Sequence, residues 1–449
     1  MFALPAAAEP LLVSLASAFT QPTFQRALVL VIGAILAPGR HTLTHLLWTV
    51  RTLAPGHYSA YHRVLSRAVW ALFPLAKILA AAILELIPTE EEVVVSVDDT
   101  NPQHKGPHVY GKGRHHDACR STHSHVVWVW GHKWVVLTMN VRFPFASRPW
   151  ALPVLAALYR PEELNRQEGR RHKTPLHLAR QLVAVLIHWF PRRKFVVVGD
   201  GGYSSHELAL FAHRHRRHMT WIGRFHPRAN LFAPPPQPRP RQNGRPRLIG
   251  RPLAKPQQVV VRATRTRATV TWYGGSTRRI EYVTGTGWWY QRGQGAVPLR
   301  WVYVHDLTGT HRDEYFFSTD EAMKPDRIVS LYTSRWSIEV TFEEVRRHLG
   351  FASPRNWRRR SVLRTAPCLL GLFSVVSLIY HRYLRQHAPR IHRTPWYHKA
   401  EPTFSDALAA VRGVFWRESV FAGGPQWAGL QKLPPQLRYY LMERLCQAA

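Results

Sequence analysis

Short apolar runs alternate with longer stretches of helical periodicity in the middle of the chain. Residues 93–97 form a β-branched run that stops at Asp98, and residues 195–198 form a wholly apolar run followed by Gly199 and Asp200. Between them, residues 175–190 repeat leucine and valine at helical spacing. Wholly apolar strands that alternate with helices predict an α/β sheet covered on both faces.

Two neighbouring patterns predict further local structure. Residues 125–143 contain two apolar runs separated by Gly131 and His132, which favours a β-hairpin. Residues 326–349 keep helical periodicity throughout, which predicts one strong helix.

The remaining segments differ in composition and predict the domain organisation. The first 90 residues are rich in alanine and leucine and predict helices, whereas residues 233–256 are rich in proline and arginine and predict an extended basic linker. Residues 257–304 combine short strand-like runs with glycine turns. We therefore expect an α/β core interrupted by a β-rich insertion, with helical regions at both ends. The expected boundaries are 1–90 for the helical N-terminal domain, 91–232 and 311–385 for the two parts of the core, 233–310 for the linker and insertion, and 386–449 for the C-terminal region.

The charge balance predicts a polyanionic partner. The 449 residues include 61 Lys and Arg but only 27 Asp and Glu, a formal net charge of +34. Such an excess repels itself in a compact protein, and nucleic acid is the commonest partner that offsets the repulsion. A charge that only keeps the protein soluble and an anionic membrane surface are the two alternatives.

Cysteine usage and the N-terminal residues bear on the compartment. Cys119, Cys368 and Cys446 are too few for a disulfide framework, which favours a reducing cytoplasm. Glu9 precedes the first apolar run and no basic residue does, which argues against a signal peptide.

Three apolar stretches, 27–37, 68–87 and 366–380, could be mistaken for membrane spans. The first and third are shorter than the roughly 20 residues that a spanning helix needs. The second is interrupted by Pro74, Lys77 and Glu85. We expect all three to be buried helices and expect no membrane partner.

One face of the helix expected at 326–349 is polar. At 100° per residue, Tyr332, Arg335, Glu339 and Arg346 fall within a sector of about 60°. An adjoining apolar stripe can pack on a core. The helix could thus present an acid between two cations, although an amphipathic helix with ordinary ion pairs has the same charges.

These four residues, in the spacing Tyr332-x2-Arg335-x3-Glu339-x6-Arg346, resemble the Y-R-E-K signature of DDE transposases from bacterial insertion sequences, with Arg in place of Lys. The steps Val97-Asp98-Asp99-Thr100 and Gly199-Asp200-Gly201-Gly202-Tyr203 are also similar to the text of that family. The resemblance covers roughly residues 91–351, and the long gap between Asp200 and Glu339 matches members with a β-strand insertion.

The resemblance implies an RNase H-like core in which Asp98, Asp200 and Glu339 hold two Mg²⁺ ions, with Mn²⁺ as a substitute. Carboxylate oxygens suit such hard cations, and paired ions stabilise both oxygens of a phosphoryl displacement. The implied chemistry is phosphodiester cleavage, followed by attack of the freed 3′-OH on target DNA.

The same resemblance implies the partners and the compartment. Tyr332, Arg335 and Arg346 would hold the phosphate of the DNA end. The expected partners are double-stranded DNA, both transposon ends and target, and a second copy of the chain in a synaptic homodimer. The expected location is a bacterial cytoplasm, associated with the nucleoid. The N-terminal helices are candidates for recognising the ends, and the C-terminal region for DNA or dimer contacts.

Two acids compete with the chosen ones. Asp99 follows Asp98 directly, but strand alternation turns it to the other face, so we favour Asp98. Glu343 lies one turn after Glu339 and is the reserve third acid.

Lys105 and Lys112 are candidate DNA contacts because they follow Asp98 closely in the sequence. Two further groups are open to two interpretations. His115, His116, Cys119, His123 and His125 could bind zinc, but clean ligand pairs are missing, and a basic loop that touches DNA is favoured. Trp288, Trp289 and Trp301 could stack on a flipped base, although core packing is more usual.

Two other functions remain compatible with these residues. One is an RNase H-like nuclease that cuts DNA without strand transfer. The other is a catalytically silent DNA-binding protein derived from a transposase. Arg346 stands where the signature has Lys, and this departure from the signature keeps that alternative open.

Overall fold

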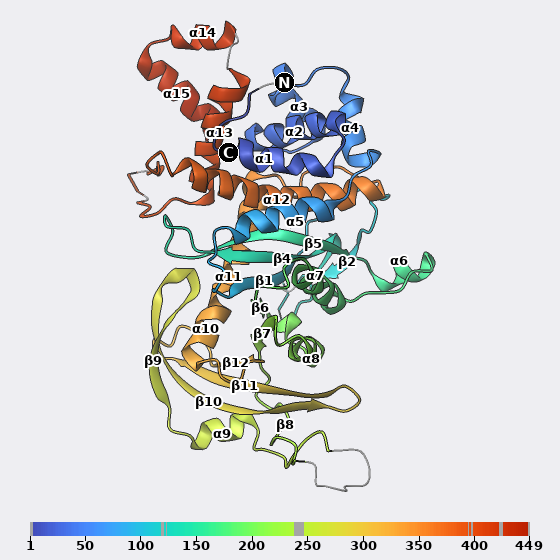
Figure 1. Ribbon diagram of the computed structural model, residues 1–449, viewed down its shortest axis with the longest axis vertical. Coiled ribbons are helices and arrows are strands. Elements are labelled where there is room, and N and C mark those ends of the chain that lie inside the picture. The colour runs from blue at the N-terminus through green and yellow to red at the C-terminus, as the bar shows by residue number, and fades with distance from the viewer. Residues whose placement is uncertain are drawn as a thin grey trace.

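The computed structural model describes residues 3–117, 121–122, 124–237, 247–393, 395–396, 398–421 and 425–447. A mixed sheet crosses the middle of the molecule, with a thick helical layer on one side of it (Figure 1). The protein is therefore a mixed α/β protein with a large sheet and many helices.

The sheet has ten strands in the order β5-β4-β1-β6-β7-β12-β11-β10-β8, and β9 pairs with β10. β1 is parallel to β6 and β6 to β7, whereas the other pairs are antiparallel. The strands are β1 (Val93–Thr100), β4 (Lys133–Val141), β5 (Trp150–Tyr159), β6 (Phe195–Gly199), β7 (Met219–Arg224), β8 (Leu231–Phe232), β9 (Thr266–Thr271), β10 (Thr277–Gln291), β11 (Gly295–Asp306) and β12 (Glu314–Ser318).

Both faces of the sheet are covered, as the wholly apolar strands predict. Along β6, Phe195 and Val197 belong to the core shared with α7 (Pro175–Trp189) and α8 (His206–Arg214). Val196 and Val198 point the other way, into a second core under α10 (Pro325–Ser334). A strand buried on both sides needs apolar residues at every position, which explains the unbroken run.

The helical layer contains the N-terminal and C-terminal segments together (Figure 1). Its central helix α12 (Arg359–Tyr383) contacts β5 on one side and helices α2, α4, α5 and α13 on others. The layer comprises α1 (Glu9–Ser14), α2 (Gln21–Leu36), α3 (Leu43–Thr49), α4 (Tyr58–Ser66), α5 (Leu72–Leu84), α12, α13 (Phe404–Phe415), α14 (Pro425–Gln431) and α15 (Pro435–Cys446). The helices predicted for residues 1–90 are thus observed.

Helix α12 is longer than its apolar stretch 366–380 indicates. With 25 residues it is the one helix in the described part of the chain that is long and apolar enough to cross a membrane. In the folded protein 61% of its apolar window is buried against other elements. The apolar stretch therefore has protein partners here, as a core helix does.

Two local predictions were wrong. The runs in 125–143 do not pair with each other as a hairpin: β3 (Trp128–Gly131) pairs with β2 (Gly113–His116), and β4 pairs with β1 and β5. The helix expected at 326–349 is divided at Arg335 into α10 and α11 (Trp336–His348). A period-2 pattern identifies a strand but not its partner, which explains the first error.

Residues 257–304 form longer strands than their glycine turns indicate. β10 has 15 residues and β11 has 12, and β11 pairs along its full length with Ile280 to Gln291 of β10. They join the main sheet through β12 and are preceded by the short α9 (Pro256–Arg262). Part of the expected linker, residues 238–246, lies outside the described residues.

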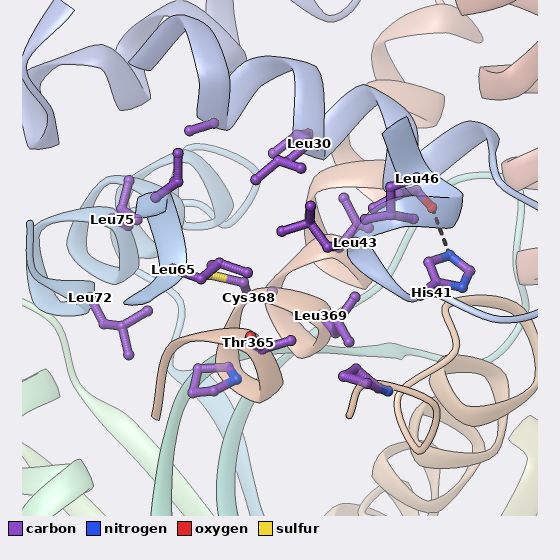
Figure 2. A pocket seen from close by; sticks show the side chains of 18 of the residues that line it. Leu30, His41, Leu43, Leu46, Leu65, Leu72, Leu75, Thr365, Cys368 and Leu369 are labelled. Carbon is purple, nitrogen blue, oxygen red and sulfur yellow. Dashed lines mark hydrogen bonds between the residues drawn. The ribbon is translucent and has the colours of Figure 1, made fainter. Parts of the chain in front are cut away.

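A cavity of about 790 Å³ lies within the helical layer, between α2, α3, α5 and α12. Figure 2 shows leucines of the N-terminal helices facing Cys368 and Leu369 of α12 across this space. The wall is mostly apolar, and Asp98, Asp200 and Glu339 are not part of it. The three acids therefore lie outside this cavity.

Arg364 ties α12 to the end of α4. Its guanidinium donates to the carbonyl oxygens of Val64, Leu65, Ala68 and Trp70, at 2.6 to 3.3 Å, and lies 4.2 Å from the centre of the Trp70 ring. It therefore pairs carbonyl groups that the end of a helix leaves without partners.

We expect Arg364→Ala to lower the free energy of unfolding by about 3 kcal/mol, because it removes the hydrogen bonds from the guanidinium to four carbonyl groups in a partly buried position. Arg360 lies one turn earlier on α12, is exposed and donates only at its tip to the Arg67 carbonyl at 3.2 Å. Arg360→Ala is the matched control and should change stability by no more than about 0.5 kcal/mol. Urea denaturation of both variants measures the difference; equal losses would contradict the assigned role.

Candidate active site

The parallel pairing of β1 with β6 brings two aspartates to one edge of the sheet. Val97 pairs with Gly199, so the next residue on each strand is an aspartate, Asp98 on β1 and Asp200 after β6. The pairing is fixed by valines that are buried on both strands. Two carboxylates thus follow adjacent parallel strands, at the end where catalytic groups of such sheets collect.

Asp98 is a buried acid in an unfavourable place for a negative charge. Its side chain is 15% exposed, and one carboxylate oxygen accepts from the Asp99 backbone N–H at 2.8 Å. Burial raises the pKa of Asp98 to about 8, and the negative charge of Asp200 adds to the rise, while the Arg335 guanidinium opposes it. Burial is the main cause of the rise, and repulsion by the Asp200 carboxylate is a smaller one.

Arg335 joins Asp98 to Glu339. One guanidinium nitrogen lies 2.7 Å from Asp98 Oδ2 and the other lies 2.7 Å from Glu339 Oε1. Its pKa is raised: burial would lower it, but the two carboxylates outweigh burial. The residue occupies the turn between α10 and α11, so the break in the predicted helix coincides with the cation between the acids.

Asp200 and Glu339 differ in their surroundings. Asp200 caps the short turn Gly201–Tyr203, and its Oδ1 accepts from the backbone N–H of Gly202 at 2.9 Å and of Tyr203 at 3.2 Å. Glu339 lies in the first turn of α11, and its side chain is 47% exposed. The three acids therefore range from buried to open, with the open one on the helix.

Asp99 has different partners from Asp98. Lys133 Nζ lies 3.3 Å from Asp99 Oδ2, and the Tyr203 hydroxyl donates to the same oxygen at 3.2 Å. Burial raises the pKa of Asp99, and Lys133 opposes the rise. The alternation along β1 thus turns Asp98 towards Arg335 and Asp99 towards Lys133.

Tyr332 is not a surface hydroxyl. The residue is 1% exposed and belongs to the second core. The centroid of its ring lies 4.3 Å from that of the Phe316 ring. Its hydroxyl lies beside the Arg224 guanidinium, and Arg335 lies 5.9 Å from the ring. The residue therefore lies behind Arg335, and its contact with DNA stays a prediction.

The other polar residues singled out from the sequence lie around this centre. Arg346 is exposed on α11 and donates to the Thr100 hydroxyl at the end of β1. Glu343 forms an ion pair with Arg347 at 2.7 Å. Lys112 donates to the Gly106 carbonyl at 2.8 Å, and Lys105 is exposed.

Among the described residues, no group of three His, Cys, Asp or Glu side chains is arranged to hold a metal ion. For the acids the reason is visible, since Arg335 stands between Asp98 and Glu339. Of the histidine cluster, Cys119 and His123 lie outside the described residues. Burial lowers the pKa of His115 to about 4, so that ring is neutral at physiological pH.

Two of the three tryptophans considered for base stacking are core residues. Trp301 is 3% exposed, and the Trp289 ring packs between Phe225 and Phe317, with ring centroids at 5.4 and 5.6 Å. For these two the interpretation as core residues holds.

Lys133 and Arg224 were missed by sequence reasoning. Lys133 opens β4 and pairs with Asp99, and Arg224 ends β7 and pairs with Glu314 at 2.5 Å. A sequence can show that a cation and an acid each stand at the end of a predicted strand. The two can be paired only when the order of the strands in the sheet is known.

The family described as "DDE superfamily endonuclease" matches residues 14–279. No curated protein matches. A solved structure described as a cryo-EM structure of the piggyBac transposase synaptic complex with hairpin DNA is 12% identical, with a TM-score of 0.40. That alignment covers 98% of this chain and 80% of the other.

The raised pKa of Asp98 gives stability a defined dependence on pH. An acid whose pKa is higher in the folded protein stabilises the fold below its ordinary value of 3.8, and this contribution is lost as the pH rises through about 8. We expect Asp98→Asn, which cannot ionise, to gain stability relative to the wild type by about 2 kcal/mol between pH 6 and pH 9, without divalent metal.

Chemical denaturation of both proteins at several pH values, with a chelator present, measures this gain. The quantity to compare is the difference in free energy of unfolding between the two proteins. Buried histidines such as His132, whose pKa is lowered to about 3, make the free energy of unfolding of each protein depend on pH as well. Parallel curves for the two proteins would contradict the expectation.

Proposed function

The chain belongs to the DDE superfamily of endonucleases, enzymes of the DDE transposase and nuclease type, and from this membership we propose that it is a DNA transposase. It would cleave phosphodiester bonds at the ends of its element and transfer the freed 3′-OH into target DNA. The observation that carries the proposal is the meeting of Asp98 and Glu339 on Arg335, beside Asp200 at the same sheet edge.

The finer assignment is a bacterial insertion-sequence transposase of the Y-R-E-K group with an RNase H-like core. Support comes from the residues Tyr332, Arg335, Glu339 and Arg346 and from the order of the acids. The formal net charge of +34 supports double-stranded DNA, both element ends and target, as the partner.

Members of this superfamily generally use divalent metal ions, and the donor set of this chain fits such ions in kind. Three carboxylates are available, and the raised pKa of Asp98 marks a place where negative charge is incompletely compensated. We propose that Asp98, Asp200 and Glu339 hold Mg²⁺, as two ions, with Mn²⁺ as a substitute. When bound, the metal would supply Lewis-acid and water-activating chemistry.

The chain's own residues prepare this centre. Asp98 must lose its proton before it can serve as a ligand, and Glu339 must leave Arg335. Arg335 presents a planar fork that suits phosphate as well as carboxylate, so a DNA phosphate can replace the acids on it. Arg346, exposed on α11 and bonded to the Thr100 hydroxyl at the end of β1, would bind the neighbouring phosphate.

We further propose that the protein acts as a synaptic homodimer on the nucleoid of a bacterial cytoplasm. Pairing two DNA ends requires two catalytic centres, which supports the dimer. The cysteines in the described part of the chain, Cys368 and Cys446, are free, which accords with a reducing compartment.

The first test removes the acids one at a time. We expect Asp200→Ala and Glu339→Gln to lower cleavage of DNA that carries the element's ends by about 100-fold or more, with binding in a mobility-shift assay kept. Asp98→Asn should lose as much, whereas Asp99→Asn should lose much less, because Asp99 faces Lys133.

Glu343→Gln is the matched control for Glu339, one turn later on α11 and paired with Arg347. It should cleave at nearly the wild-type rate. Full activity of the Asp200 and Glu339 variants would refute the proposal. A joined DNA product in the same assay distinguishes a transposase from a nuclease that only cuts.

The second test concerns Arg346. If it binds a phosphate, Arg346→Ala should lower the slope of log binding constant against log salt concentration by about one unit. Arg346→Lys keeps the charge and should keep the slope. Arg347→Ala, a neighbouring exposed arginine paired with Glu343, is the control and should leave the slope unchanged. A slope unaffected by Arg346→Ala would show that Arg346 contacts no phosphate.

A further inference from the structure

The small β2–β3 ribbon carries an outward face of aromatic and basic side chains. Trp128 and Trp130 alternate with the buried Val129 along β3 and are 49% and 58% exposed. Opposite them on β2, His116 pairs with Trp128 and Arg114 pairs with Trp130 in the strand register. Residues directly opposite each other share a face of the ribbon, so these side chains form one surface.

Cations lie over both indole rings. The Arg114 guanidinium is 4.8 Å from the centre of the Trp128 ring, and Lys112 Nζ is 5.5 Å from that of Trp130. Both tryptophans, with Lys105 and His104, also line a hollow of about 520 Å³. The surface therefore combines ring faces with positive charge around a concave space.

The ribbon is fixed to the edge of the sheet that carries the acids. The His104 backbone N–H donates to the Trp130 carbonyl at 3.1 Å, and the His132 N–H donates to the Pro102 carbonyl at 3.0 Å. Gly131 is needed there, since a Cβ would lie 2.1 Å from the Pro102 oxygen. β1, which carries Asp98 and ends at Thr100, leads into the ribbon through residues 101–112, and the chain leaves the ribbon at Lys133, which pairs with Asp99.

Nucleobases are the ligand that this surface fits. A base offers a flat ring to an exposed indole, and the strand that carries it offers phosphates to nearby cations. In a duplex the base faces are covered by their neighbours, so only unpaired bases can stack on the ribbon. Two of the three tryptophans on the β10–β11 pair, Trp289 and Trp301, are packed in the core and cannot serve this purpose.

We propose that the outward face of the β2–β3 ribbon binds unpaired nucleobases of a DNA strand next to the cleaved phosphate. The proposal rests on the proposed function for the presence of DNA at this edge of the sheet. Trp128 and Trp130 supply the stacking surfaces, and Lys112 and Arg114 bind the phosphates of the same strand.

The experiment compares binding of a short oligothymidine and of a blunt duplex by the full-length protein. Trp128→Ala with Trp130→Ala should weaken oligothymidine binding about 5- to 100-fold and leave duplex binding within about twofold. Replacing both tryptophans by Phe keeps the stacking surface and should restore most of the affinity. A 2-aminopurine base in the oligonucleotide should be quenched on binding by the wild type but not by the Ala variant.

Trp48→Ala is the matched control, because Trp48 is 68% exposed and has Arg51 at 5.1 Å but belongs to the helical layer. It should not change oligothymidine binding. The proposal is overturned if the Ala variant binds oligothymidine normally, if duplex binding falls equally, or if the Phe variant is as weak as the Ala variant. Loss of self-association without loss of oligothymidine binding would instead identify a second copy of the chain as the occupant.

Failure of the stacking proposal can be distinguished from failure of the proposed function. Normal oligothymidine binding by the Ala variant, together with an inactive Asp200→Ala, removes only the stacking site. Cleavage by Asp200→Ala, together with selective loss of oligothymidine binding in the tryptophan variant, removes only the proposed catalytic role.

Discussion

The burial of the Asp98 carboxylate beside a second acid is the constraint on which the rest of the candidate site depends. The parallel pairing of β1 and β6 places Asp98 and Asp200 at adjacent strand ends, where burial makes the negative charge of Asp98 costly. Arg335 offsets part of that cost by bridging Asp98 to Glu339. A fold that gathers acids in this way gives up stability to keep them together, as functional sites commonly do.

The local chemistry of the site was accessible from the sequence because each acid has a distinctive neighbourhood. Valine runs predicted the two strands, and the spacing on the helix predicted that Arg335 and Glu339 share a face, as their 2.7 Å contact shows. Strand alternation also separated Asp98 from Asp99 correctly in orientation. These features depend on residues within a few positions of one another, where periodicity is informative.

Features set by distant contacts were not accessible. The pairing of β3 with β2 accompanies a close approach of Gly131 to Pro102, and the break at Arg335 coincides with its bond to an acid on another element. Sequence reasoning considered Trp288, Trp289 and Trp301 for base stacking, whereas the fold packs Trp289 and Trp301 into the core and exposes Trp128 and Trp130, which that reasoning passed over. Strand partners and side-chain burial come from the tertiary fold, which a single sequence does not specify by pattern.

The position of β12 has a consequence for how this architecture can change. β12 follows the long β10–β11 pair in the chain, yet it lies between that pair and β7 in the sheet. Removal of residues 233–310 would therefore strip one side of β12 and leave a row of unpaired backbone N–H and C=O groups. An exposed strand edge of this kind promotes aggregation. Residues 233–310 therefore cannot be gained or lost as an independent unit unless another segment pairs with β12.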